Sequence, residues 1–171
     1  MTSAMFSKKH QTKFRIVDDL KSDISFEGYG SDLNELFSSC ALGLSSISYD
    51  IDMVPKSKKI GFSLSGKPEI LLYDFLSKIL FLVDTKEMFF SEFNVKLNLK
   101  DSGNKNDLGS EDTLGDLERE YTLTCKCLGA PMADISNMKS KVHVKAITLH
   151  NLRISKIEPK IEYIAHVSLD V

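Results

Sequence analysis

Carboxylates gather near both ends of this chain. Asp18, Asp19 and Asp23 fall within six positions near the beginning, and Asp170 precedes Val171, the last residue. Period-two alternation places Asp23 at the start of one expected strand and Asp170 in the last one, each on the polar face. Two aspartates and an α-carboxylate in one place would suit a hard divalent cation. Spacing alone does not bring Asp23 to Asp170, so two solvated aspartates at strand ends remain the competing interpretation.

The other reactive residue types give weaker signals. Cys125 and Cys127 stand two apart on one strand face, a tighter spacing than paired zinc cysteines use, and we expect them to pack in the core. Cys40 lies on the apolar stripe of an expected helix, so a core position is predicted for it too. A P-loop, a G-x-S-x-G turn and an H-E-x-x-H helix are all missing from the sequence.

Composition narrows the classes of function. The net charge of -2 and the pI of about 6.1 argue against a protein that binds nucleic acid through an overall positive charge, although a local basic patch stays possible. The longest apolar runs are far shorter than the roughly 20 residues of a membrane span. An odd number of cysteines without framework spacing predicts free thiols in a reducing compartment, either the cytoplasm or the nucleus.

The apolar periodicity predicts two helices and several strands. Leu33, Leu36, Phe37, Cys40 and Leu44 recur at helical spacing, with Ser31 expected as the N-cap and a turn expected at Gly28 and Gly30. A second, more buried helix is expected to begin at Pro68 and run to Val83. Alternating segments predict strands at 14–18, 23–27, 60–65, 93–99, 121–127, 142–154 and 161–171.

This order of elements predicts an α+β fold, a mostly antiparallel β-sheet with two main helices packed on one face. We expect one domain over residues 14–171, after a flexible tail at 1–13. The polar, acidic and glycine-containing stretch near 100–118 lacks periodicity and is predicted to be a disordered insertion.

Three segments, in order, resemble the archease family. The stretch VKAITLHNLRI, from Val144 to Ile154, is similar to the family signature, and EILLYDFLSKILFLVDTKEMFF is similar to its second helix and the following strand. The start motif Asp-His-Thr-Ala-Asp corresponds to residues 19–23, with both aspartates kept and Leu20 in place of the histidine. The family's aliphatic-Asp-aliphatic ending corresponds to residues 169–171, so the resemblance covers roughly 14–171.

The resemblance implies a function. Archeases are small α+β proteins that act as cofactors of the RtcB-type tRNA-splicing ligase, promoting its guanylylation and multiple turnover, and are not enzymes themselves. It implies a metal site of Asp23, Asp170 and Val171, with Asp19 in support, for a divalent ion such as Ca²⁺, Mg²⁺ or Mn²⁺. The expected partner is the ligase, and RNA would be met only through it. No membrane and no small-molecule substrate is expected.

Two other classes of protein stay open. One is a metal-dependent phosphoester hydrolase using Asp19, Asp23 and Asp170, for which His150 is the only attractive general base. The other is a chaperone-like binding module with no role for a metal.

Overall fold

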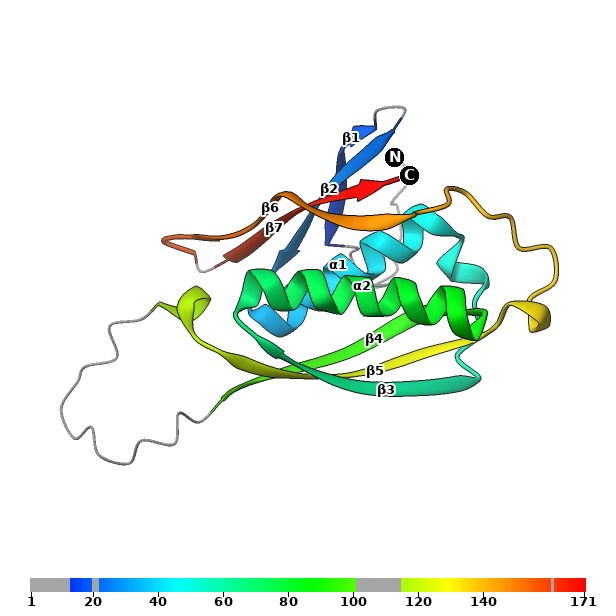
Figure 1. The fold of residues 1–171 in the computed structure, drawn as a ribbon, viewed down its shortest axis with the longest axis horizontal. Coiled ribbons are helices and arrows are strands. Elements are labelled where there is room, and N and C mark those ends of the chain that lie inside the picture. The colour runs from blue at the N-terminus through cyan, green and yellow to red at the C-terminus, as the bar shows by residue number, and fades with distance from the viewer. Residues whose placement is uncertain (1–12, 20–21, 101–114, 161) are drawn as a thin grey trace, which may run out of the picture.

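The computed structural model describes residues 13–19, 22–100, 115–160 and 162–171. These residues form three layers, in which two helices lie between two antiparallel sheets (Figure 1). One sheet has the order β1-β2-β7-β6, made of β1 Phe14–Asp19, β2 Asp23–Gly30, β7 Glu162–Asp170 and β6 Ala146–Ile157. The other has the order β3-β5-β4, made of β3 Lys58–Gly66, β5 Tyr121–Pro131 and β4 Met88–Leu99. The helices are α1 Leu33–Ser48 and α2 Pro68–Lys86, and short 3₁₀ turns cover Ile51–Met53, Asp116–Glu118 and Met132–Asp134.

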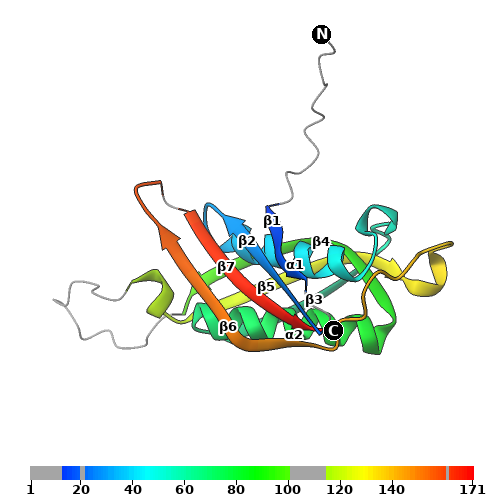
Figure 2. The ribbon, with the colours of Figure 1, turned by 90° about the horizontal axis from the view of Figure 1, so that it is seen from above.

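The predicted fold class is confirmed, because the strands pair antiparallel and the two helices fall where the periodicity put them. The division of the strands into two sheets is an additional finding. Alternation within a strand reveals an apolar face but not which strands share a sheet. Seen from above, the first sheet crosses the helix layer, and the chain end at β7 lies beside the beginning of β2 (Figure 2).

Helix α1 is buried on two sides because it contacts both β2 and β4. Small residues let the helix and strand approach each other: a Cβ on Gly30 would lie 2.3 Å from the backbone nitrogen of Leu36, and one on Gly28 would lie 2.5 Å from the Cys40 sulfur. The turn expected at Gly28 and Gly30 is therefore wrong. Both glycines lie inside β2, where they make room for the helix.

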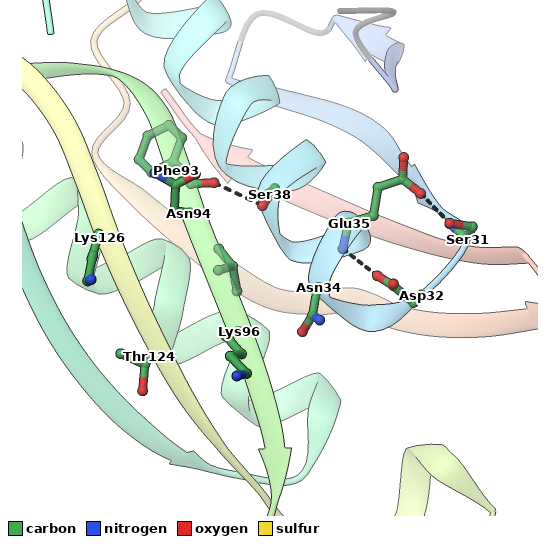
Figure 3. A pocket seen from close by; sticks show the side chains of 11 residues that line it. Ser31, Asp32, Asn34, Glu35, Ser38, Phe93, Asn94, Lys96, Thr124 and Lys126 are labelled. Carbon is green, nitrogen blue, oxygen red and sulfur yellow. Dashed lines mark hydrogen bonds between the residues drawn. The ribbon is translucent and has the colours of Figure 1, made fainter.

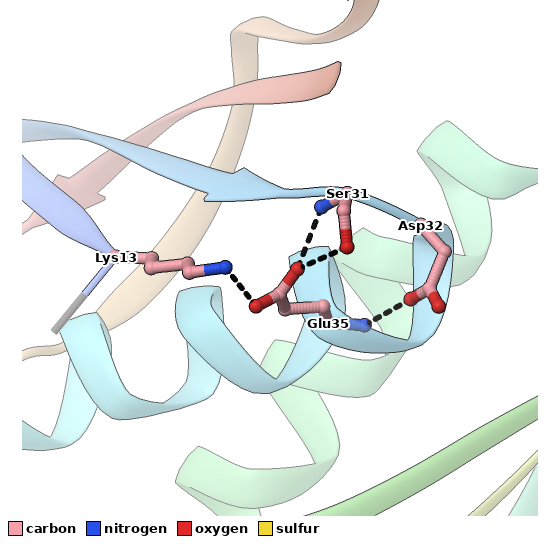
Figure 4. Close-up of polar contacts among 4 residues, drawn as sticks. All are labelled: Lys13, Ser31, Asp32 and Glu35. Atoms are coloured by element: carbon pink, nitrogen blue, oxygen red, sulfur yellow. Dashed lines mark hydrogen bonds and ion pairs between the residues drawn. The ribbon is translucent and has the colours of Figure 1, made fainter. Parts of the chain in front are cut away.

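The helix start also differs from the expectation. Asp32, not Ser31, is the N-cap, and its carboxylate accepts the amide of Glu35 at 2.8 Å (Figure 4). The Glu35 carboxylate in turn accepts from the Ser31 amide and hydroxyl and from Lys13. This is a capping box shifted by one residue. Ser31 lies one residue before the N-cap and binds the Glu35 side chain from there.

The insertion and the penultimate strand need corrections at their ends. Residues 1–12 and 101–114 lie outside the described part of the chain, but Asp116–Glu118 forms a 3₁₀ turn. Asp116 accepts hydrogen bonds from the Tyr163 hydroxyl at 2.8 Å and from Lys156 at 3.0 Å, so this end of the expected disordered insertion is folded against the first sheet. Strand β6 begins at Ala146, not at Val142, because its partner β7 ends opposite at Asp170.

The cysteines lie in the core as predicted. Cys40, Cys125 and Cys127 are free and buried, and the sulfurs of Cys125 and Cys127 are 3.6 Å apart. Burial raises the pKa of the Cys40 thiol, which disfavours its reactive thiolate form. Among the described helices, none is both long and apolar enough to span a membrane.

Candidate metal centre

The pairing of β2 with β7 brings the two ends of the sequence together. Asp23, the first residue of β2, stands directly opposite Asp170, the last residue of β7. Directly opposed residues of antiparallel strands project from the same face of the sheet. The two aspartates that the sequence placed on polar strand faces are therefore neighbours.

The hydrogen bonds around the pair set its geometry. The amide of Val171 donates to the carbonyl of Ser22 at 3.2 Å, so the bond joins the residues that flank Asp23 and Asp170. Such a pattern makes the two aspartates a non-hydrogen-bonded pair, with Cα atoms about 4.5 Å apart and side chains at their closest. Asp23 is exposed and Asp170 half-buried, and the Ser22 hydroxyl donates to Asp23 at 3.4 Å.

The neighbouring core residues hold this register. Ile24 pairs with Leu169 on the opposite face, and both are buried against the helix layer, at 5% and 0% exposure. A slip of one residue would turn these apolar side chains to solvent and the aspartates inward. Because β7 lies between β2 and β6, the Asp170 strand is supported on both sides, and the Lys145 amide donates to the Asp170 carbonyl at 2.8 Å.

Comparisons with known proteins identify the relatives of this chain. The model of the Archease protein family (MTH1598/TM1083) matches residues 14–171. The chain belongs to the archease family. Among curated relatives, the archease of Archaeoglobus fulgidus is 31% identical over 160 residues, covering 93% of this chain and 99% of that protein. The archease of Pyrococcus furiosus is 31% identical over 137 residues, covering 80% and 84%. The solution structure of Methanobacterium thermoautotrophicum protein 1598 shares the fold with a TM-score of 0.70, at 24% identity, over 94% of this chain and 99% of that one.

Of the other predicted site residues of this archease, Val171 directly follows Asp170, whereas the side chain of Asp19 is outside the described residues. The backbone of Asp19 pairs with Ile24, and all of Leu20 is also outside the described residues. His150 is exposed on β6, in a stretch between Thr148 and Arg153 where the register with β7 is interrupted. Within the described ranges, no three His, Cys, Asp or Glu side chains gather at one point, so His150 does not complete a cluster with Asp23 and Asp170.

The residues present fit a hard divalent cation in donor type. The pair offers carboxylate oxygens, the ligands that Ca²⁺, Mg²⁺ and Mn²⁺ prefer, and lacks the sulfur and imidazole donors typical of zinc sites. Those hard cations take six or more oxygen ligands. Two carboxylates therefore leave room on an ion for ligands from solvent or from a partner.

The face of the β1-β2-β7-β6 sheet that carries Asp23 and Asp170 also has a strip of polar side chains, which the sequence analysis did not single out. Next to the aspartates, the Ser25 and Ser168 hydroxyls lie 2.9 Å apart, and one row further Glu27 stands opposite His166. The Tyr29 hydroxyl donates to Glu27 at 2.6 Å and lowers the pKa of that carboxyl. The signal was available, since all of these residues share the period-two phase of Asp23 and Asp170.

His166 stands out within this strip. Its Nδ1 is buried and has no hydrogen-bond partner among the described residues, and burial lowers the pKa of its imidazole. The neutral ring is therefore the favoured form on this part of the face.

Proposed function

We propose that this chain is a non-catalytic, metal-binding protein cofactor of an RtcB-type tRNA-splicing ligase. It would promote guanylylation and multiple turnover of the ligase in tRNA splicing and RNA repair, in the cytoplasm or the nucleus. Family membership supports the class of function. The observation that carries the proposal for this chain is the register that sets Asp23 opposite Asp170.

The two aspartates are suited to present a cation rather than enclose it. They lie at the ends of the two central strands of the sheet, with Asp23 exposed, so a partner surface can approach them. A bound Ca²⁺, Mg²⁺ or Mn²⁺ would supply positive charge to phosphate oxygens at the mouth of the ligase active site. Asp23 and Asp170 would hold the ion by their carboxylates. By the family resemblance, Val171 would supply the third ligand, and Asp19 would be a supporting residue.

A catalytic role of its own has less support. A hydrolase needs a base beside the metal, and the described residues bring neither His150 nor another His, Cys, Asp or Glu side chain into a cluster with the aspartates. We therefore propose that the ligase performs the chemistry and meets the RNA and GTP.

The test combines purified chain, cognate ligase, GTP and a divalent metal. Substoichiometric chain should raise the guanylylated fraction of the ligase and permit repeated RNA joining. Asp23→Ala and Asp170→Ala should each abolish the stimulation without altering the circular dichroism spectrum. Asp74→Ala, an exposed aspartate on α2, is the matched control and should stimulate normally.

Three results would reject this function. The first is the absence of stimulation by the unaltered chain. The second is full stimulation by both aspartate variants, which would remove the metal-site assignment. The third is phosphatase or nuclease turnover by the chain alone with magnesium or manganese, lost on Asp23→Ala, which would establish the hydrolase instead.

A further inference from the structure

The outer face of the second sheet differs in charge from the rest of the molecule. On β3, the side chains of Ile60, Phe62 and Leu64 turn toward the helices, so the alternate positions face solvent. The register extends this solvent-facing set across the three strands. The set consists of Lys59, Gly61, Ser63 and Ser65 on β3, Thr122, Thr124, Lys126 and Leu128 on β5, and Glu92, Asn94, Lys96 and Asn98 on β4. We call this set the lysine face.

Three lysines cross the lysine face on a diagonal. Lys59 pairs opposite Leu128, Lys126 lies two residues further along β5, and Lys96 pairs opposite Thr124, two residues further still. Diagonal neighbours of this kind are about 7–8 Å apart at the backbone. The flexible ammonium groups can therefore meet successive charges of one extended polyanion.

The charges on this face are not neutralised within the described protein. Lys59, Lys96 and Lys126 are exposed, and none forms an ion pair with a carboxylate of the described residues. Glu92, the carboxylate that the register places on this face opposite Leu128, forms an ion pair with Lys56, so it does not cancel the charge of these three lysines. A chain of net charge -2 thus carries three positive charges on one face. A surface of this kind is complementary to a polyanion.

A hollow adjoins the lysine face at the free edge of β4. Its volume is about 720 Å³, and Lys96, Lys126, Asn94 and Thr124 line the side formed by the sheet (Figure 3). The first turns of α1 form the other side, with Asp32 among its residues. The hollow therefore has a cationic wall and an acidic wall.

The edge of β4 is closed to an added peptide strand. Asn34 of α1 accepts the outward amide of Leu97 at 2.7 Å, and the Ser38 hydroxyl donates to the outward carbonyl of Phe93 at 3.0 Å. Helix α1 thus already occupies two of the backbone groups to which an extended peptide would bind.

A nucleotide chain is chemically complementary to both walls of the hollow. Phosphates can follow the lysine diagonal, while ribose hydroxyls and base amino groups can donate to the Asp32 carboxylate across the hollow. Only a single strand leaves its bases free to enter such a hollow. We propose that the lysine face and the adjoining hollow bind single-stranded RNA directly.

This proposal goes beyond the cofactor role. The two sheets lie on opposite sides of the helices, so the lysine face and the Asp23–Asp170 pair point away from each other (Figure 1). The chain could then hold RNA on one side while it meets the ligase with the other. The test below uses the chain alone, so its outcome does not depend on whether the chain activates a ligase.

Fluorescence anisotropy with a labelled single-stranded RNA of about ten nucleotides measures the binding. Three phosphate contacts give a logarithmic salt slope of about -2, so the Kd should rise roughly 20-fold between about 50 mM and about 200 mM salt. The lysine face has no aromatic side chain, and Phe93, which lines the hollow, is only 5% exposed. Base stacking should therefore contribute little, and we expect this strong salt dependence. The combined variant Lys59→Gln, Lys96→Gln, Lys126→Gln should weaken binding at low salt at least about 10-fold and flatten the slope.

The matched control removes three exposed lysines elsewhere, by Lys86→Gln, Lys139→Gln and Lys160→Gln, and should bind RNA like the unaltered chain. Circular dichroism and thermal unfolding should be unchanged in both variants, because all the substituted side chains lie at the surface. An equal loss in the control would overturn the proposal, since net charge alone would then explain binding. Absence of RNA binding at low salt, equally tight binding of the DNA strand of the same sequence, or preferential binding of an acidic peptide would each overturn it as well.

Discussion

Replacing Asp23 by asparagine removes one of two facing negative charges and keeps the shape of the side chain. Like charges directly opposite each other on neighbouring strands are destabilising. Two charges about 5 Å apart at a water-exposed site interact by roughly 1 kcal/mol or less. In the presence of a chelator, Asp23→Asn should therefore be slightly more stable than the unaltered chain, by up to about 2–4 °C in Tm for a domain of this size.

A bound cation should reverse that order. An ion that binds only the folded chain stabilises it by about 2.7 kcal/mol at a concentration of 100 times the Kd. Asp23→Asn halves the side-chain carboxylates of the site, so it should gain little from the ion. Thermal unfolding followed by circular dichroism, with chelator and then with Ca²⁺, Mg²⁺ or Mn²⁺, measures both effects.

The control is Asp74→Asn, which makes the same change of charge on the exposed side of α2 and should respond to cations like the unaltered chain. The reasoning fails if none of the three cations raises the Tm of the unaltered chain. It also fails if Asp23→Asn gains as much as Asp74→Asn.

Two further predictions concern the start of α1. Gly30→Ala places a Cβ against the backbone of Leu36 and should destabilise by about 1–3 kcal/mol in urea unfolding, whereas Gly61→Ala, whose nearest atom is at 3.7 Å, should change little; equal effects would refute the close-approach argument. Hydrogen bonds from Lys13 and Ser31 lower the pKa of Glu35 to about 2, so its stabilising effect should be complete above about pH 4.5 and vanish as the pH falls toward 2. The difference in unfolding free energy between the unaltered chain and Glu35→Gln should therefore shrink as the pH falls from about 4.5 toward 2. Urea unfolding at several pH values measures it, and a difference that stays constant would contradict the ion pair.

Local pattern predicted the faces of the strands but not their partners. Alternation alone assigns Asp23 and Asp170 to polar faces, because the period of a strand is two residues. Their meeting depends on the pairing of β2 with β7, which joins segments some 140 residues apart in sequence and leaves no local signal. The family resemblance supplied what periodicity could not.

The wrong prediction at Gly28 and Gly30 has a tertiary cause. The sequence predicts a turn there because glycine most often marks one. Here the absence of a Cβ serves packing, since α1 lies so close to β2 that backbone meets backbone. Whether a glycine relaxes a turn or admits a neighbouring helix depends on tertiary contacts, which a single strand's pattern does not contain.

The layered architecture explains why the candidate surfaces lie where they do. Each sheet packs its inner face against the helices. Phe26 and Leu169 are buried on the inner face of the first sheet, and Leu123 and Cys125 on that of the second. The strands' polar side chains that can bind an ion or a partner therefore lie on the two outer faces. One outer face is acidic at the Asp23–Asp170 end and suits a cation, while the other carries unpaired lysines and suits a polyanion. Because the helix layer separates the two faces, a substitution on one face leaves the side chains of the other in place, so metal binding and RNA binding can be tested independently in the same chain.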